Sequence, residues 1–260
     1  MDKRDDWACP TPVRGLRFRT PSGRLVPIPC NRSKCPACSR RQGMITAAMV
    51  GIDAEQDQPS VVSTITTRDQ VTAATLREGQ RQVVRQVRQE LGHSARYCSF
   101  VEWTTGRRDG VRRPHMHALW KDVHPDEAAV IEQAARDVFG RLAGAHVHEA
   151  AALRTPAAAA AYVASHHLKE SQAPPPSWRG VRRVRPSRGY WSIPAKELRQ
   201  LATAYVRERR LEVRAAALAQ ERGLPPEAWE PIFEKLDRSR VEVVRVREDR
   251  WGVVEVLGPV

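Results

Sequence analysis

The chain has 260 residues, enough for one good-sized domain with appendages or for two small domains. Lysine and arginine total 43 against 30 acidic residues, and the resulting formal charge of +13 suits a polyanionic partner such as a nucleic acid. The sequence shows no signal peptide, lipidation motif or long apolar run, which argues against a secreted or membrane protein. We therefore expect a soluble cytoplasmic protein without a membrane partner.

Four of the five cysteines lie near the start of the chain, at Cys9, Cys30, Cys35 and Cys38. The last three are spaced C-x4-C-x2-C in a turn-rich segment, and four thiolates suit a tetrahedral Zn²⁺ site. Residues 1–40 have little apolar periodicity and would depend on the metal to fold. The alternative is a mixture of buried and free thiols, while Cys98 is expected to be an ordinary core residue.

The predicted elements alternate between helices and strands. After the cysteines, the sequence predicts a helix at 39–52, a strand at 60–67, a helix at 72–91 stopped by a glycine, two strands around 102 and 115–120, a helix at 126–142, a short strand at 145–149, an alanine-rich helix at 155–169, a long helix at 193–221 and a terminal β-hairpin at 240–257. This order favours an α+β fold with an antiparallel sheet backed by helices.

The two central strands carry a candidate metal site. His115 and His117 are two residues apart, so both side chains project from one face of their strand. If the two strands pair antiparallel through the loop at 107–113, Glu102 lies across from the histidines. Two imidazoles and a facing carboxylate are typical ligands of a divalent metal.

A second H-x-H pair, His146 and His148, offers an alternative. The neighbouring Glu149 belongs to the opposite face of that strand, so the second pair lacks a facing acid. We therefore favour His115 and His117 as the metal ligands.

The alanine-rich helix carries a candidate nucleophile. Tyr162, His166 and Lys169 recur at helical spacing and share one face. A tyrosine hydroxyl is a poor nucleophile without help. In that role, His166 would accept its proton, and Lys169 would neutralise a phosphate oxygen or favour the phenolate. A divalent metal would polarise the phosphate from the other side. The alternative is that Tyr162 packs in the core.

A strongly basic segment follows a run of three prolines. It interleaves arginines with aromatic residues, which offers phosphate contacts and stacking surfaces for unpaired bases. The alternative is a solvated basic loop. The candidate DNA-binding residues are Arg179, Arg182, Arg183, Arg185, Arg188 and Tyr190.

Taken in order, these motifs resemble the HUH endonucleases, and above all the rolling-circle replication initiators of single-stranded DNA phages and plasmids. The resemblance covers residues 7–192. It rests on the cysteine-rich start, the threonine-rich strand Ser63-Thr64-Ile65-Thr66-Thr67, the motif Arg113-Pro114-His115-Met116-His117 with Glu102 as third ligand, the helix from Ala161 and the basic segment 185–190.

The resemblance implies an antiparallel sheet of about five strands flanked by helices. It implies a zinc-binding segment at 1–45, an endonuclease domain at 46–195 and a C-terminal helix and hairpin at 196–260. The implied activity is nicking of single-stranded origin DNA by Tyr162 with Mn²⁺ or Mg²⁺, which leaves a 5′-phosphotyrosine and a 3′-hydroxyl primer. Host polymerase and helicase are the implied protein partners.

One departure from the family concerns the nucleophile helix. The family usually has Tyr-x-x-Lys, often with a second tyrosine four residues on, whereas this chain has Ser165 and His166 at those two positions. Tyr162 is then a single nucleophile served by the more distant Lys169, or the nucleophile is lost; Tyr190 is a weaker substitute. Two other functions stay open: a zinc-containing DNA-binding regulator without nuclease activity, and a related relaxase or transposase.

Overall fold

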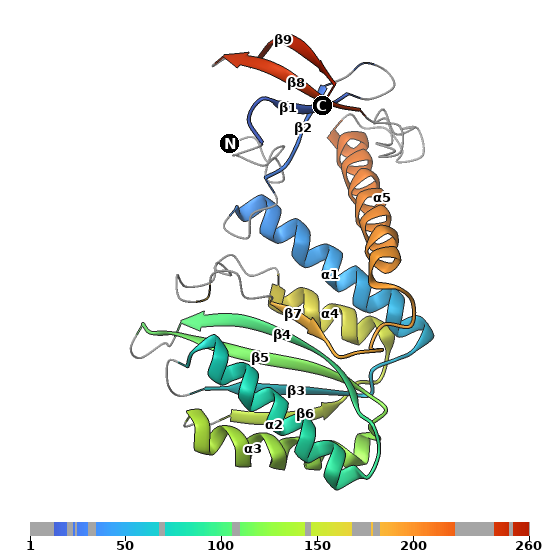
Figure 1. Ribbon diagram of the computed structural model, residues 1–260. Coiled ribbons are helices and arrows are strands. Elements are labelled where there is room, and N and C mark those ends of the chain that lie inside the picture. The colour runs from blue at the N-terminus through green and yellow to red at the C-terminus, as the bar shows by residue number, and fades with distance from the viewer. Residues whose placement is uncertain are drawn as a thin grey trace. The chain divides into compact units, whose positions relative to one another are not determined.

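The computed structural model describes residues 13–19, 23, 25–30, 35–67, 71–105, 110–143, 147–167, 178, 183–221, 242–249 and 252–259. The helices are α1 (Pro36–Gln56), α2 (Ala73–Leu91), the short 3-10 helix η2 (Pro125–Glu127), α3 (Ala128–Ala143), α4 (Pro156–His167) and α5 (Ala195–Glu221). The strands are β1 (Leu16–Arg19), β2 (Leu25–Pro27), β3 (Val61–Thr66), β4 (Arg96–Thr105), β5 (Arg112–Lys121), β6 (Val147–Ala152), β7 (Val184–Pro186), β8 (Glu242–Asp249) and β9 (Gly252–Pro259). Figure 1 shows the course of the chain.

The chain divides into two compact units. Residues 42–203 form one, and residues 1–41 together with 204–260 form the other. The first contains a five-stranded sheet in the order β6-β3-β5-β4-β7, in which every neighbouring pair is antiparallel. The α+β class and the antiparallel five-stranded sheet predicted from the sequence are therefore confirmed.

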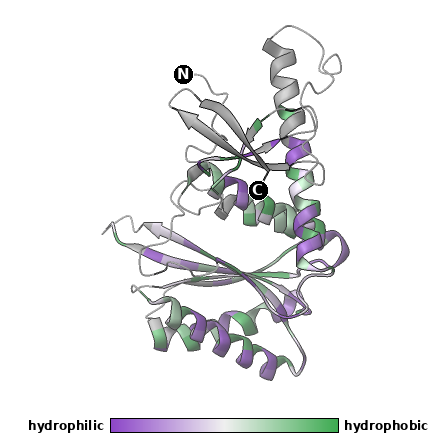
Figure 2. Cartoon of the chain, turned by 45° about the horizontal axis from the view of Figure 1, so that its top comes forward, coloured by the Kyte–Doolittle hydropathy of each residue, from purple (hydrophilic) through white to green (hydrophobic). Residues whose placement is uncertain are grey.

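Helices cover both faces of this sheet, with α2 and α3 on one face and α1 and α4 on the other (Figure 1). Helix α2 begins after Thr72, whose hydroxyl accepts a hydrogen bond from the Thr75 N–H, and ends at Gly92 in the left-handed conformation. Its buried stripe of leucine and valine packs in the larger core with α3. Figure 2 shows hydrophobic and hydrophilic residues alternating along both helices.

The unit formed by the two ends of the chain contains a second sheet, in the order β2-β1-β8-β9. The predicted C-terminal hairpin is present as β8 and β9. Strand β8 also pairs with β1, so that Phe18 lies opposite Val243. The hairpin therefore shares a sheet with the N-terminal strands, a pairing that the expected division into separate segments at 1–45 and 196–260 did not include.

Some predicted boundaries shift. The strand expected at 145–149 lies at Val147–Ala152, and the helix expected at 39–52 extends over Pro36–Gln56. The basic segment contributes a short strand, β7, which pairs with β4 at the edge of the sheet. Among the described residues, the structure contains no helix with the length and apolar character needed to cross a membrane.

A buried ion pair ties β5 to α1. Nζ of Lys121, which is 1 % exposed, donates to Asp53 Oδ2 at 2.6 Å, to Asp57 Oδ2 at 3.1 Å and to the Tyr190 carbonyl at 2.9 Å. The other Asp53 oxygen accepts hydrogen bonds from the backbone N–H and the hydroxyl of Ser192. Each buried charge thus has a partner, which offsets its loss of hydration.

Replacing Lys121 with methionine is expected to lower the free energy of unfolding by about 3–5 kcal/mol, because Asp53 would keep a buried charge without its counter-ion. Urea titrations followed by tryptophan fluorescence would measure the change. The matched control is Lys196→Met on the exposed side of α5, which should change the value by less than about 0.5 kcal/mol. Equal effects of the two substitutions would show that the buried pair contributes no more than a surface lysine.

Candidate metal and nucleophile site

Strands β4 and β5 place the predicted metal ligands on one face of the sheet, and β3 adds two threonines beside them. In the register of β4 and β5, Glu102 lies opposite His115. In the register of β3 and β5, Thr66 lies opposite His115 and Thr64 opposite His117. Because side chains alternate along a strand, these five residues share the face that α4 covers. The pairing predicted from the sequence is therefore present.

The ligand atoms of Glu102, His115 and His117 all lie within 4.8 Å of one another, one of two groups among the described residues that can hold a metal ion. Nε2 of His117 lies 3.1 Å from Oε1 of Glu102. Glu102 is 2 % exposed and His117 is 3 % exposed. Burial strengthens the attraction between a carboxylate and a cation. A set of two histidines and one carboxylate is typical of the ligands of a divalent cation.

Hydroxyl groups contact the Nδ1 atoms of both histidines. Thr66 Oγ1 lies 3.1 Å from Nδ1 of His115, and Thr64 Oγ1 lies 3.1 Å from Nδ1 of His117. Such contacts fix the ring orientation, and for His117 they leave Nε2 directed at Glu102. The sequence predicts both threonines on the strand but assigned them no role. The signal was present, because their spacing of two matches that of the histidines across the strand pair.

Helix α4 brings Tyr162 to this site. The Tyr162 hydroxyl lies 2.7 Å from Nδ1 of His117 and 2.8 Å from Thr64 Oγ1, and its ring meets the His117 ring edge-on. Burial raises the pKa of the hydroxyl above its usual value, the hydrogen bond from Thr64 lowers it, and the negative charges of Glu102 and Glu149 raise it. Tyr162 therefore stays protonated near neutral pH in the absence of a cation.

The two predicted helpers of Tyr162 are less well defined. His166 lies on α4, but its side chain is outside the described residues, as is Lys169 as a whole. Their roles stay predictions. For the second H-x-H pair, His146 lies outside the described residues, and so does the side chain of His148.

Glu149 takes a position that the sequence did not predict. On β6 it lies opposite Thr64, so it belongs to the same face of the sheet as the metal cluster, and its side chain is exposed. Its negative charge acts on Tyr162. Glu149 is therefore an acidic neighbour of the site.

The basic segment divides into buried and exposed residues. The Arg183 guanidinium lies 5.9 Å from the ring centre of the buried Trp103, and burial lowers its pKa to about 10 while Glu102 acts in the opposite direction. Arg185 lies on β7, and Arg188 is exposed. Arg179 and Arg182 lie outside the described residues.

Tyr190 differs from the expectation. Its ring is 1 % exposed, packs in the core between the sheet and α1 and α4, and lies 4.5 Å below Nζ of Lys121. A ring buried in this way has no face open to a base, so Tyr190 does not provide the predicted stacking surface. Burial also raises the pKa of its hydroxyl well above the usual value.

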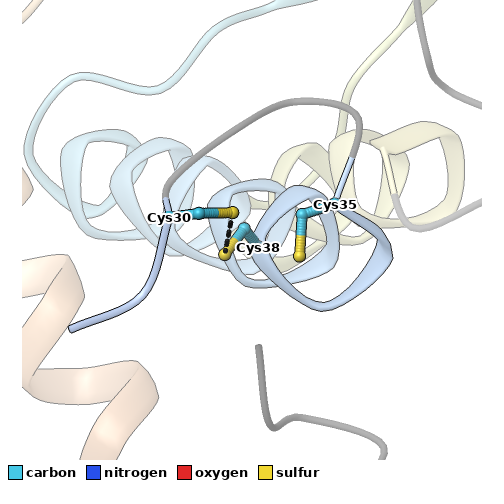
Figure 3. A group of neighbouring side chains, drawn as sticks. All are labelled: Cys30, Cys35 and Cys38. Carbon is cyan, nitrogen blue, oxygen red and sulfur yellow. Dashed lines mark hydrogen bonds between the residues drawn. The ribbon is translucent and has the colours of Figure 1, made fainter. Parts of the chain in front are cut away.

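Three of the four predicted zinc ligands converge. Cys30 lies before α1, while Cys35 and Cys38 lie at its start, and their sulfur atoms are within 4.8 Å of one another. Sγ of Cys30 is 3.7 Å from Sγ of Cys38, as Figure 3 shows. Cys9, the expected fourth ligand, lies outside the described residues. Three converging thiols can hold a metal ion, and thiolates favour Zn²⁺. Cys98 is fully buried in the core, as expected.

Because the sequence predicts zinc at this cluster, replacing Cys38 with serine is expected to remove about one zinc ion per chain, since a hydroxyl is a much weaker zinc ligand than a thiolate. Zinc content would be measured by inductively coupled plasma mass spectrometry after dialysis against a weak chelator. Cys98→Ala is the matched control, since it removes a cysteine outside the cluster and should leave the zinc content unchanged. Unchanged zinc in Cys38→Ser would contradict a thiolate site at α1.

Comparison of the chain with profiles of protein families, with curated proteins and with solved structures finds no match, so its description rests on the sequence and the geometry above.

Proposed function

We propose that the protein is a metal-dependent endonuclease that nicks single-stranded DNA at a replication origin and becomes joined to the 5′ end through Tyr162. The observation that carries the proposal is the contact between the nucleophile and the ligand set: Tyr162 Oη lies 2.7 Å from Nδ1 of His117, and Nε2 of the same ring lies 3.1 Å from Glu102. The sequence pattern of the rolling-circle initiators and the charge of +13 support DNA as the substrate.

The three candidate metal ligands would serve to activate the scissile phosphate. A divalent cation held by Glu102, His115 and His117 would polarise the scissile phosphate. A cation held through Nε2 of His117 would leave the ring proton on Nδ1, which would then donate a hydrogen bond to Tyr162 Oη. That hydrogen bond favours the phenolate, and Thr64 supplies a second one from its hydroxyl.

The nucleophilic half uses Tyr162. Its oxygen attacks phosphorus, the bond from phosphorus to the 3′ oxygen breaks, and the 3′ oxygen takes up a proton. The product is a 5′-phosphotyrosine and a free 3′-hydroxyl from which a host polymerase extends. Attack by a 3′-hydroxyl on the phosphotyrosine reverses the step and rejoins a strand. His166 and Lys169 are proposed to take the phenol proton and to neutralise a phosphate oxygen.

The test uses 5′-labelled and 3′-labelled single-stranded oligonucleotides that tile the DNA flanking the gene, incubated with the protein and Mn²⁺ or EDTA. Denaturing gels should show an adduct that needs Mn²⁺ and retains the 3′ label. Tight binding that EDTA leaves unchanged, with no adduct on any oligonucleotide, would contradict the proposal and favour a DNA-binding regulator. Cleavage confined to transfer or transposon ends would favour a relaxase or transposase.

A further inference from the structure

A cavity of about 690 Å³ lies at the β7 edge of the five-stranded sheet, next to α2. Its lining includes Arg77, Gln80, Arg81, Tyr97 and Arg185. This volume is within the range of about 300–1,000 Å³ that is usual for ligand pockets. None of these residues takes part in the metal and nucleophile site.

The cavity opens on the other face of the sheet from the metal ligands. Tyr97 and Glu102 lie on one strand an odd number of residues apart, so their side chains point to opposite faces. Ser99, which pairs with Arg185, shares the face of Tyr97 and donates a hydrogen bond to Oε1 of Gln80 at 3.2 Å. The cavity is therefore a separate site.

Gln80 supplies a polar group suited to a ligand. It is 8 % exposed, and Ser99 occupies its oxygen, but its buried Nε2 has no hydrogen-bond partner among the described residues. A buried donor left unsatisfied costs about 1–3 kcal/mol, so such groups normally have a partner. An acceptor atom of a ligand in the cavity would provide one.

The charge of the cavity selects an anion. Arg77 and Arg81 lie one turn apart on α2, and Arg185 faces them from β7. Nε of Arg77 donates to the Ala73 carbonyl at 3.0 Å, which holds its guanidinium at the cavity. Glu78 pairs with one of these arginines, Arg81, on the exposed side of the helix. Guanidinium groups bind phosphate through charge and paired hydrogen bonds, so the three arginines of the lining suit a phosphate group.

Tyr97 adds an aromatic surface. Its ring is half-buried and packs at 5.5 Å from the ring of Trp120. Burial raises the pKa of its hydroxyl, against the effect of the positive charges of Arg88 and Arg185, so the ring remains neutral. An aromatic ring beside arginines is the usual arrangement for stacking an unpaired base while its phosphate is bound.

We propose that this cavity binds a nucleotide of single-stranded DNA, with phosphate on Arg77, Arg81 and Arg185, the base against Tyr97 and a base acceptor on Gln80 Nε2. The proposal rests on the proposed function, because the strand that occupies the cavity would be the substrate strand. It gives the strand a second point of attachment, on the face of the sheet opposite the nick. The same nucleoside phosphate chemistry could come from a free nucleotide, which the test separates.

The test measures binding of a fluorescent 20-nucleotide oligothymidylate by anisotropy in EDTA, where no cleavage occurs. The variant Arg77→Gln/Arg81→Gln should bind about 10-fold more weakly, and the slope of log Kd against log salt should fall by about 0.7 for each phosphate that the variant no longer neutralises. The matched control is Arg85→Gln/Arg136→Gln, which removes the same charge from exposed positions of α2 and α3 outside the cavity and should bind like the wild type. Tyr97→Leu should also weaken binding about 10-fold.

Equal affinity of the two double variants would overturn the proposal. Thymidine monophosphate that competes as well as the oligonucleotide would identify a free nucleotide as the ligand and would also overturn it. Because binding is measured without a cation, the outcome is independent of the nicking reaction. Cavity-dependent binding without any adduct would refute the proposed function alone, and an adduct with cavity-independent binding would refute this inference alone.

Discussion

Replacing Tyr162 with phenylalanine is expected to abolish the covalent protein–DNA adduct, a loss of ~10³-fold or more, since it removes the oxygen that we propose attacks phosphorus. The ring still fills its place against His117, and Thr64 still contacts Nδ1 of that histidine, so the ligand set keeps its orientation. The Mn²⁺ affinity should therefore change by at most about 10-fold. Adduct formation on denaturing gels and Mn²⁺ binding by calorimetry measure the two effects.

Tyr205→Phe is the matched control for this substitution, because Tyr205 is 56 % exposed on α5 and lies outside the site. It should form the adduct at the wild-type rate. The contrary result is an adduct that persists in Tyr162→Phe but needs a much higher Mn²⁺ concentration to form. It would show that Tyr162 positions His117 and that another residue attacks the phosphate.

Replacing Glu102 with glutamine is expected to raise the Kd for Mn²⁺ by about 100-fold or more, and to lower nicking to a similar extent at limiting Mn²⁺. Loss of a residue that hydrogen-bonds to a metal ligand already lowers metal affinity by about 10–100-fold. Glu102 is proposed to be a ligand itself, so its loss should cost at least as much. The amide keeps the size of the carboxylate but loses the charge that attracts a cation at this buried position. A titration of nicking rate against Mn²⁺ concentration should show that excess metal restores part of the activity.

The control for the loss of charge is Glu149→Gln. Glu149 is an exposed acid on the same face of the sheet, opposite Thr64, and it is not part of the metal cluster. In Glu149→Gln, the Mn²⁺ concentration that gives half-maximal nicking should stay within about 3-fold of the wild-type value, as expected for an exposed charge in water. Equal effects of the two substitutions would mean that the summed negative charge on this face of the sheet attracts the cation, and that Glu102 is not a ligand.

The convergence of Glu102, His115 and His117 could be predicted because it depends on local rules. Side chains alternate between the two faces along β5, so His115 and His117 share one face. The antiparallel pairing of β4 with β5, which follow each other in the sequence, sets the register that places Glu102 beside them. Helical periodicity likewise predicted α2 and its end at Gly92. The register of β3 adds Thr64 and Thr66, whose spacing of two is visible in the sequence but whose place beside the histidines depends on the order of three strands.

Other features depend on partners far away in the sequence. The pairing of β1 with β8 joins segments more than two hundred residues apart, and neither strand carries a signal for the other. Tyr190 follows five arginines of the basic segment and was expected at the surface, yet the carbonyl and ring contacts with Lys121 hold it in the core. The buried pair of Lys121 and Asp53 has no local signature either, because charged residues are ordinarily exposed.

The most direct test of the central claim is to identify the residue that carries the DNA. Each of the four tyrosines falls on a different tryptic peptide, and the peptide 155–169, between Arg154 and the cleavage after Lys169, contains Tyr162 as its only tyrosine. The adduct formed with Mn²⁺ would be digested with nuclease and trypsin and sequenced by tandem mass spectrometry. The account predicts a nucleotide on Tyr162 of that peptide. A nucleotide on a peptide that carries Tyr97, Tyr190 or Tyr205, or on a serine, would contradict it.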